Sequence, residues 1–207
     1  RSSAASDVYK RQSRNLFGLN FARTSRKNYF LICEGYMDVI ALHQAGFQNA
    51  VASLGTAFTP QQARLMSRYT KEVYLTYDSD GAGVAAAIRA IPILKEAGLS
   101  AKVIDMKPYK DPDEFIKALG AEEYQKRIDQ ALNSFFFEIS VLERDYDLED
   151  PEQKTKFFNE MAKKLLVFTE EIERNNYIEA LSRKYNVSYE NLRKLVNRYG
   201  AQMTVVN

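Results

Sequence analysis

Tyr29-Phe30-Leu31-Ile32-Cys33-Glu34-Gly35 begins the part of the chain that decides the fold. An unbroken apolar run followed directly by an acid and a glycine is typical of a buried strand with a polar group at its carboxyl end. From here on, short strand-like runs alternate with segments of helical period, which predicts a mostly parallel four-stranded α/β sheet with flanking helices. The expected strands are 29–33, 49–52, 73–77 and 102–106, and the expected helices are 37–44, one that begins at Thr59-Pro60, and 82–97.

After about Asp113 only helical period remains, which predicts that an all-α helical bundle follows the sheet. We expect this bundle over residues 121–200, with a short tail over 201–207. At the other end, residues 1–12 are small and polar without an apolar period, so they are interpreted as a non-native or disordered tail. The helices predicted beyond Asp113 are 114–119, 121–146, 151–168, 172–185 and 189–199.

Composition narrows the class of protein. Hydrophobic residues make up 45% of the 207, enough for one core and a smaller helical domain. No apolar run approaches the length of a membrane span, so no membrane partner is expected. Cys33 is the only cysteine, which excludes a disulfide framework and fits a reducing cytosol. Residues 1–30 carry seven Lys and Arg against one acid. This charge fits either a polyanionic partner or a solvated tail.

Acidic side chains follow three of the predicted strands. Because the carboxyl ends of parallel strands meet at one edge of a sheet, these acids should converge. Ionised carboxylates that converge repel one another, and a bound dication reverses the sign of that interaction. Oxygen ligands without histidine or cysteine suit Mg²⁺ or Mn²⁺. The expected ligands and catalytic residues are Glu34, Asp78 and Asp80, with Asp38, Asp111 and Asp113 as further metal-site members.

Several features beside the acids could serve a phosphate. Gly81 and Gly83 would let backbone approach backbone or phosphate at the start of a helix. The loop with Gly55-Thr56 follows a strand and precedes a helix, where backbone N–H groups could hold phosphate. Arg89 either braces the acidic edge or contacts a nucleic-acid template, and both remain open. Asp80 could also be a helix N-cap and nothing more.

Four motifs, in order and spacing, resemble the TOPRIM segment of bacterial DnaG-type primases. They are Glu34-Gly35-Tyr36-Met37-Asp38-Val39-Ile40, Ala52-Ser53-Leu54-Gly55-Thr56, Tyr77-Asp78-Ser79-Asp80-Gly81-Ala82-Gly83 and Lys110-Asp111-Pro112-Asp113-Glu114. The first is far more specific than the general pattern of one glutamate and an Asp-x-Asp. Ser13-Arg14-Asn15-Leu16-Phe17-Gly18-Leu19 resembles the segment that leads into this domain, and the helices to about Arg198 resemble the bundle that closes the primase RNA polymerase domain.

The resemblance implies a Rossmann-like TOPRIM domain over 29–120, with a lead-in segment over 13–28. It implies a nucleotidyltransferase that makes short RNA primers in bacterial DNA replication with Mg²⁺ or Mn²⁺. Its partners would be single-stranded DNA template, nucleoside triphosphates and the replicative helicase, in the cytoplasm at the replication fork. The residues that would bind nucleotide or nucleic acid are Arg14, Gly55, Thr56, Gly81, Gly83 and Arg89.

The chain departs from the family pattern at two positions. Many relatives have glycine where Ser79 stands, and we expect tolerance there because the middle residue of Asp-x-Asp points away from the metal. Relatives usually carry a lysine where Gln12 stands. The zinc ribbon, the basic N-terminal subdomain and the C-terminal helicase-binding domain of such primases are expected to be absent. We therefore expect the chain alone to bind metal and to synthesise primers poorly or not at all.

Three other functions fit parts of the sequence. One is another TOPRIM enzyme, such as a nuclease; a topoisomerase would need a nucleophilic tyrosine from a further domain. The second is a metal-dependent nucleic-acid binder without catalysis. The third is a Rossmann-like phosphohydrolase that uses Asp78 as phosphoryl acceptor. Metal binding without polymerisation would favour the first two.

Overall fold

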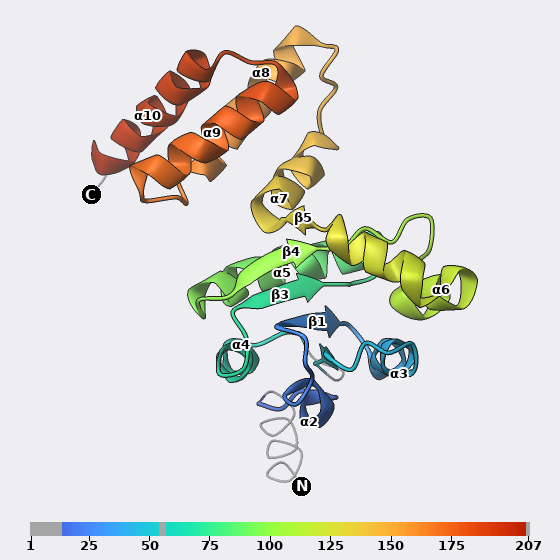
Figure 1. The fold of residues 1–207 in the computed structure, drawn as a ribbon. Coiled ribbons are helices and arrows are strands. Elements are labelled where there is room, and N and C mark those ends of the chain that lie inside the picture. The colour runs from blue at the N-terminus through green and yellow to red at the C-terminus, as the bar shows by residue number, and fades with distance from the viewer. Residues whose placement is uncertain (1–13, 54–56, 206–207) are drawn as a thin grey trace, which may run out of the picture. The chain divides into compact units, whose positions relative to one another are not determined.

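The protein divides into two compact units between Phe137 and Glu138, as seen in a computed structural model that describes residues 14–53 and 57–205. The first unit is an α/β layer structure and the second is helical (Figure 1). The strands of the first unit are β1 Tyr29–Cys33, β2 Ala50–Ala52, β3 Glu72–Leu75, β4 Ser100–Val103 and β5 Leu132–Asn133. Its helices are α2 Leu19–Ala22, α3 Tyr36–Gln44, α4 Pro60–Ser67, α5 Gly81–Glu96 and α6 Pro112–Asp129.

The sheet has the strand order β2-β1-β3-β4-β5, and its first four strands run parallel. Ile32 at the centre of the sheet lies opposite Val51 of β2 and Leu75 of β3. The predicted α/β class with four parallel strands is confirmed. β3 and β4 begin and end slightly earlier than predicted, because their last predicted residues lie in loops that leave the sheet.

A fifth strand corrects the sequence prediction at the edge of the sheet. Residues 121–146 were expected to form one helix, but β5 interrupts them and pairs antiparallel with β4. Asn133 lies opposite Lys102, and Leu132 lies opposite Val103. A strand of two residues is too short to show an alternation of apolar and polar side chains. The segment forms a strand because the edge of β4 is otherwise unpaired and offers backbone partners. The predicted break before Ala121 is present, since Gly120 has a φ of +83° inside α6.

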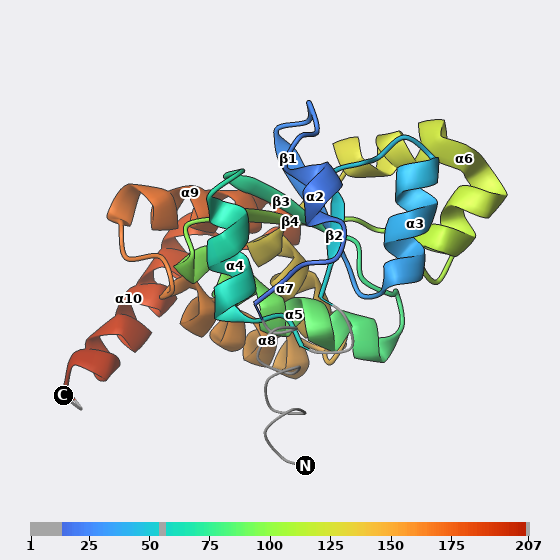
Figure 2. The same cartoon turned by 90° about the horizontal axis from the view of Figure 1, so that it is seen from below.

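Helices cover both faces of the sheet. α4 and α5 lie on one side of the strands, and α3 and α6 lie on the other (Figures 1 and 2). The first face buries Phe30, Ile32 and Leu75 with side chains of α4 and α5, and the second buries Leu31 and Cys33 with side chains of α3 and α6. β1 therefore continues into α3 on one face, while its neighbour β3 continues into α5 on the other. Such a divergence opens a crevice beyond the carboxyl ends of the two strands.

Local signals in the sequence set the helix ends. Thr59 caps α4: its hydroxyl accepts a hydrogen bond from the Gln62 N–H (3.1 Å), and the Gln62 side chain accepts one from the Thr59 N–H (3.0 Å). Pro60 takes the first helical position, where a missing N–H costs nothing. Gly46 and Gly98 follow the ends of α3 and α5 with positive φ, as expected for glycines that end helices.

A buried chain of polar atoms joins α6 to the end of β3. The hydroxyl of Tyr124, fully buried, donates to Thr76 Oγ1 (2.7 Å), and Thr76 Oγ1 donates to Met106 Sδ (3.2 Å). A buried hydroxyl is tolerated only with a partner, because its lost hydration must be replaced. These two hydrogen bonds therefore hold α6 in place against the end of β3, the strand that leads to Asp78.

The second unit is a helical bundle. Its helices are α8 Pro151–Leu165, α9 Glu171–Tyr185 and α10 Tyr189–Val205, preceded by α7 Ser134–Glu143, which crosses the division between the units. Phe157, Met161, Leu181 and Val196 are fully buried in its core. The Tyr185 hydroxyl donates to Glu143 Oε2 (2.8 Å), which ties the end of α9 to α7. α8 and α9 follow the predicted helices closely, whereas α10 continues past the predicted end at Tyr199 to Val205, through residues that were expected to form a tail.

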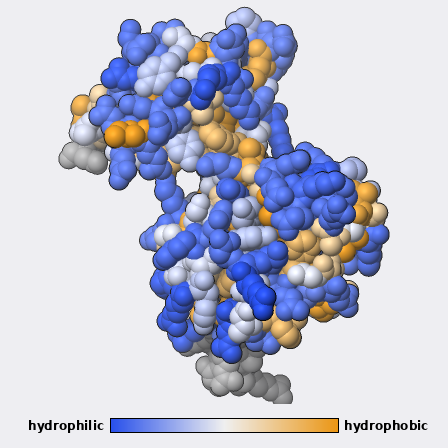
Figure 3. Space-filling model, viewed as in Figure 1, coloured by the Kyte–Doolittle hydropathy of each residue, from blue (hydrophilic) through white to orange (hydrophobic). Residues whose placement is uncertain are grey.

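The face of the molecule in view in Figure 3 is mostly hydrophilic, with hydrophobic side chains in smaller groups. The large hydrophobic side chains that are exposed come from several elements, among them Met37, Ile172 and Met203. Among the residues described, no helix combines the length and the apolar character needed to cross a membrane.

Replacing Tyr124 with phenylalanine should lower the free energy of unfolding by about 1–2 kcal/mol, because Thr76 Oγ1 loses its buried donor. Chemical denaturation measures the change. Tyr69→Phe, at a side chain 45% exposed, is the control and should change little. Equal stability of Tyr124→Phe and the parent chain would contradict this role.

Candidate metal centre

The ends of β1 and β3 meet through one hydrogen bond. Glu34 directly follows β1, and Asp78 lies three residues beyond β3. The Asp78 N–H donates to Glu34 Oε1 over 2.7 Å. The structure thus brings together the first two acidic clusters in the crevice between diverging connections, where open α/β sheets bind ligands.

Asp80 caps α5. Its Oδ1 accepts a hydrogen bond from the Gly83 N–H (2.8 Å). The side chain is therefore an N-cap, and its second oxygen has no bond within the described protein. Gly83 is required for another reason: a Cβ at this position would overlap the carbonyl oxygen of Asp78. Gly81 has open space around it, so no close approach demands glycine there.

The third cluster packs against α3. Asp111 caps α6 by accepting from the Glu114 N–H (2.8 Å). The Asp113 N–H points to Asp38 Oδ1 at 3.4 Å, and Asp113 Oδ2 pairs with Lys117 Nζ at 3.0 Å. Asp38 itself is only 8% exposed. The loop after β4 is thus held beside the helix that follows Glu34.

Burial and mutual repulsion make two of these carboxylates reluctant to ionise. Burial, together with the Asp111 carboxylate, raises the pKa of Asp38 to about 7, while the Asp113 N–H acts in the opposite direction. Burial also raises the pKa of Asp78 to about 6, assisted by the charges of Glu34, Asp111 and Asp80 and opposed by Lys110. A positive charge at this edge would stabilise every ionised member.

The donor set fits a hard dication such as Mg²⁺ or Mn²⁺, because all its members offer carboxylate oxygen. In the part of the chain that is described, no three acidic, histidine or cysteine side chains stand close enough together to hold an ion. Glu34, Asp80 and Asp111 each direct one oxygen to a backbone N–H instead. The chemistry of the residues therefore matches a cation, while their oxygens are engaged by the protein.

Arg89 shares a cavity with Glu34. The cavity measures about 180 Å³ and has mostly apolar walls from Phe58, Tyr77 and Ile93, completed by Ser53, Ala57, Ala86 and Ala90. This places Arg89 beside the acidic edge.

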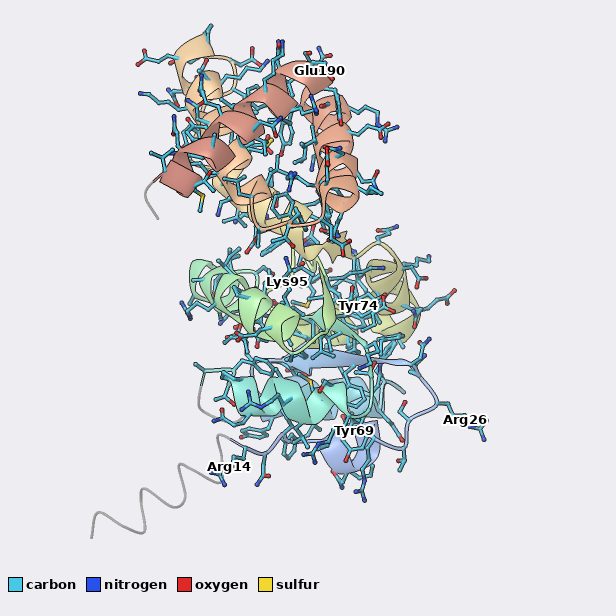
Figure 4. All side chains as sticks on the ribbon, turned by 90° about the vertical axis from the view of Figure 1, so that its left-hand side faces the viewer. Arg14, Arg26, Tyr69, Tyr74, Lys95 and Glu190 are labelled. Atoms are coloured by element: carbon cyan, nitrogen blue, oxygen red, sulfur yellow. The ribbon has the colours of Figure 1, made fainter. Side chains whose placement is uncertain are left out.

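The exposed Arg14 lies at the outside of the first unit, as Figure 4 shows, and no contact in the described protein brings it to the acids. Gly55 and Thr56 lie outside the described residues.

Ser79 was not among the site residues expected from the sequence. Its hydroxyl donates to the carbonyl oxygens of Tyr109 (2.7 Å) and Lys110 (3.1 Å), and its N–H donates to that of Lys110 (2.8 Å). A local sequence pattern cannot predict hydrogen-bond partners thirty residues away. The two acidic loops come together because β3 pairs with β4.

Family models match both parts of the chain. A model described as Toprim-like matches residues 31–116, and a model described as the DnaB-helicase binding domain of primase matches residues 136–189. The second match corrects the expectation that the helicase-binding part lies wholly outside the chain. Helical period alone could not reveal it, because bundles of many kinds share that pattern.

Sequence relatives are bacterial DNA primases. The chain is 36% identical over 196 residues to the DNA primase of Clostridium acetobutylicum, covering 94% of this chain and 33% of the relative. It is 39% identical over 158 residues to the DNA primase of Aquifex aeolicus, covering 75% of this chain and 30% of the relative. The chain thus spans about a third of the length of these relatives.

Solved structures of similar fold agree. The zinc-binding and RNA polymerase domains of the Aquifex aeolicus primase superpose with a TM-score of 0.67 at 36% identity, covering 87% of this chain and 43% of that one. A DnaG primase catalytic domain bound to single-stranded DNA superposes with a TM-score of 0.71 at 30% identity, covering 87% and 59%.

In metal-free buffer, the free energy of unfolding should fall as pH rises from about 4 to 7. In that range folded Asp38, with its raised pKa, binds a proton that the unfolded chain has released. Asp38→Asn mimics the protonated form, so it should stabilise the protein at pH 8 by on the order of 2 kcal/mol and flatten the pH dependence. Denaturation with a chelator across this pH range measures both effects. Asp145→Asn, at an exposed position, is the control. A destabilised Asp38→Asn at pH 8 would refute the expectation.

Gly83→Ala should destabilise the protein by about 1–3 kcal/mol or displace the Asp78 turn, because the added methyl group meets a backbone carbonyl. Gly81→Ala, two residues earlier in the same helix, should be neutral or slightly stabilising. Thermal denaturation of both variants decides. If Gly83→Ala and Gly81→Ala change the stability equally, the close approach of Gly83 to the Asp78 carbonyl does not affect the free energy of unfolding.

Proposed function

Since the chain belongs to the family of bacterial DnaG-type primases and carries their Toprim domain, we propose that it forms the catalytic part of an enzyme that synthesises RNA primers on single-stranded DNA. The observation that carries the proposal is the hydrogen-bonded approach of Glu34 and Asp78 at the point where α3 and α5 leave opposite faces of the sheet. The activity of a whole primase is proposed rather than observed, since this chain spans a third of such a protein.

We assign the metal to the acidic edge. Glu34, Asp78 and Asp80 would hold Mg²⁺ or Mn²⁺, which when bound neutralises phosphate charge and favours ionisation of the attacking hydroxyl. Asp38, Asp111 and Asp113 would complete the negative field around it. Lys110, whose charge acts on Asp78, is suited to attract a triphosphate. The residues proposed to contact nucleotide or template are Arg14, Gly55, Thr56, Gly81, Gly83 and Arg89.

The chain's own contacts prepare the site for this chemistry. The hydrogen bond from the Asp78 N–H fixes the Glu34 carboxylate beside the Asp78 backbone, and Gly83 lets the carbonyl of Asp78 lie close to the start of α5. Such preorganisation reduces the rearrangement needed when charge develops on a phosphate. The cavity beside Glu34 also has Arg89 in its lining, which supplies a positive charge there.

We propose the substrates, the partner and the place of action of the whole protein from its family. Nucleoside triphosphates and single-stranded DNA are the proposed substrates, supported by a similar catalytic domain that binds single-stranded DNA. The replicative helicase is the proposed partner, supported by the match of residues 136–189. The place of action is the bacterial replication fork in the cytoplasm. The proposed domain limits are 29–120 for the Toprim domain and 121–200 for the helical subdomain.

Titration with Mn²⁺ tests the site. The 207-residue chain should bind Mn²⁺, and Asp78→Ala should bind it at least ten-fold more weakly, since a carboxylate between Glu34 and Asp111 is lost. Asp145→Ala, which removes an exposed acid of the helical unit, should leave binding unchanged. Isothermal titration calorimetry or electron paramagnetic resonance gives the affinities. Absence of Mn²⁺ binding by the parent chain would overturn the metal assignment.

Primer synthesis is measured next, on a single-stranded template with nucleoside triphosphates. We expect little product from the chain alone. The chain joined to the upstream part of the Aquifex aeolicus primase should make dinucleotides, and Asp78→Ala in that fusion should reduce the rate at least 100-fold. Metal binding by a fusion that cleaves DNA but makes no product would instead favour a Toprim nuclease. Binding of DNA without either reaction would favour a non-catalytic role.

A further inference from the structure

Ser79 connects two acidic loops that come from different strands. Asp78 and Asp80 lie in the loop from β3 to α5, and Asp111 lies at the end of the loop from β4 to α6. Ser79 reaches across with both its hydroxyl and its N–H, which donate to the carbonyl oxygens of Tyr109 and Lys110 over 2.7–3.1 Å. The middle residue of the Asp-x-Asp turn is thus bonded away from the acids, to the neighbouring loop.

The loop that receives Ser79 is itself anchored. Arg127 of α6 donates to the carbonyl oxygens of Asp105 (2.8 Å) and Lys107 (2.9 Å). At the far end, the Lys110 N–H donates to Glu114 Oε2 (2.7 Å). The carbonyls that Ser79 uses therefore lie in a segment fixed to α6 on both sides. Because these acceptor carbonyls are held in place, the hydrogen bonds from Ser79 also hold the Asp78-Ser79-Asp80 turn in place.

The bond acts against electrostatic repulsion. Asp78 and Asp80 on one loop and Asp111 on the other are carboxylates of like charge, and Ser79 joins the two loops that carry them. Two loops that carry like charges tend to separate unless uncharged bonds hold them together. Ser79 supplies such bonds without adding charge. A glycine or alanine here would retain only the bond from the backbone N–H.

We propose that Ser79 is a positioning residue, whose hydroxyl holds the Asp78-Ser79-Asp80 turn against the Tyr109–Lys110 segment so that the β3 and β4 acidic loops meet a cation as one unit. This inference rests on the proposed function and assigns Ser79 no contact with metal or substrate. It reverses the expectation that this position is freely tolerant. Its effect reaches the cation through the distance between Asp78 and Asp111.

Mn²⁺ affinity of Ser79→Ala tests the proposal. Loss of the Ser79 hydroxyl, whose single proton is shared between the carbonyl oxygens of Tyr109 and Lys110, should weaken Mn²⁺ binding about three- to ten-fold, the effect of about one lost hydrogen bond. Ser79→Thr keeps the hydroxyl and should restore most of the affinity. Ser67→Ala is the matched control, because Ser67 also donates to a backbone carbonyl, that of Arg64, but at an exposed site at the end of α4, before β3 begins. It should bind Mn²⁺ like the parent.

A purely structural serine would give a different result. In that case Ser79→Ala would lower the melting temperature and leave Mn²⁺ affinity unchanged, which would overturn the proposal. Unchanged affinity together with unchanged melting would overturn it as well. Failure of the parent chain to bind Mn²⁺ would refute the metal assignment itself, so the two failures are distinguishable. In the primase fusion, Ser79→Ala should raise the Mn²⁺ concentration needed for half-maximal rate, with little change in the rate at saturating Mn²⁺.

Discussion

The hydrogen bond from the Asp78 N–H to Glu34 Oε1 is the interaction on which the acidic edge depends. It joins the ends of two adjacent parallel strands at the place where their connections separate to opposite faces. The carboxylate gains a donor in a half-buried position, which offsets part of its lost hydration. Everything proposed for this edge follows from that approach, since acids held farther apart would neither repel strongly nor share a cation.

Accumulated negative charge has a cost for folding. Asp38 is buried beside Asp111 and Asp113, and Asp78 lies between Glu34 and Asp80, so both are harder to ionise than free aspartates. Groups with perturbed pKa values in a crevice are candidates for function, because packing alone would favour apolar residues there. The folded state tolerates this charge through backbone donors, one for each of several carboxylates, and through Lys110 and Lys117 nearby.

Neutral groups around the acids define the geometry. Gly83 allows the Asp78 carbonyl to approach the start of α5, and Ser79 ties the same turn to the segment before α6. Closer to the core, the buried hydroxyl of Tyr124 donates to Thr76 and links α6 to the end of β3. Thr76 and Ser79, on either side of Asp78, are thus bonded to residues that follow β4. Order at the site is therefore a property of the β3–β4 pair, and the charged residues alone do not create it.

The sequence by itself determined the α/β class, the four parallel strands, the helix ends at Thr59 and Gly120, and the acids at the ends of strands. These features depend on local period and capping, which a few neighbouring residues decide. It missed β5, because a two-residue strand exists only through the free edge of β4. It also missed the link from Ser79 to Tyr109 and Lys110. A serine reads alike in any loop, and only the folded chain brings a carbonyl thirty residues away within 2.7 Å of its hydroxyl.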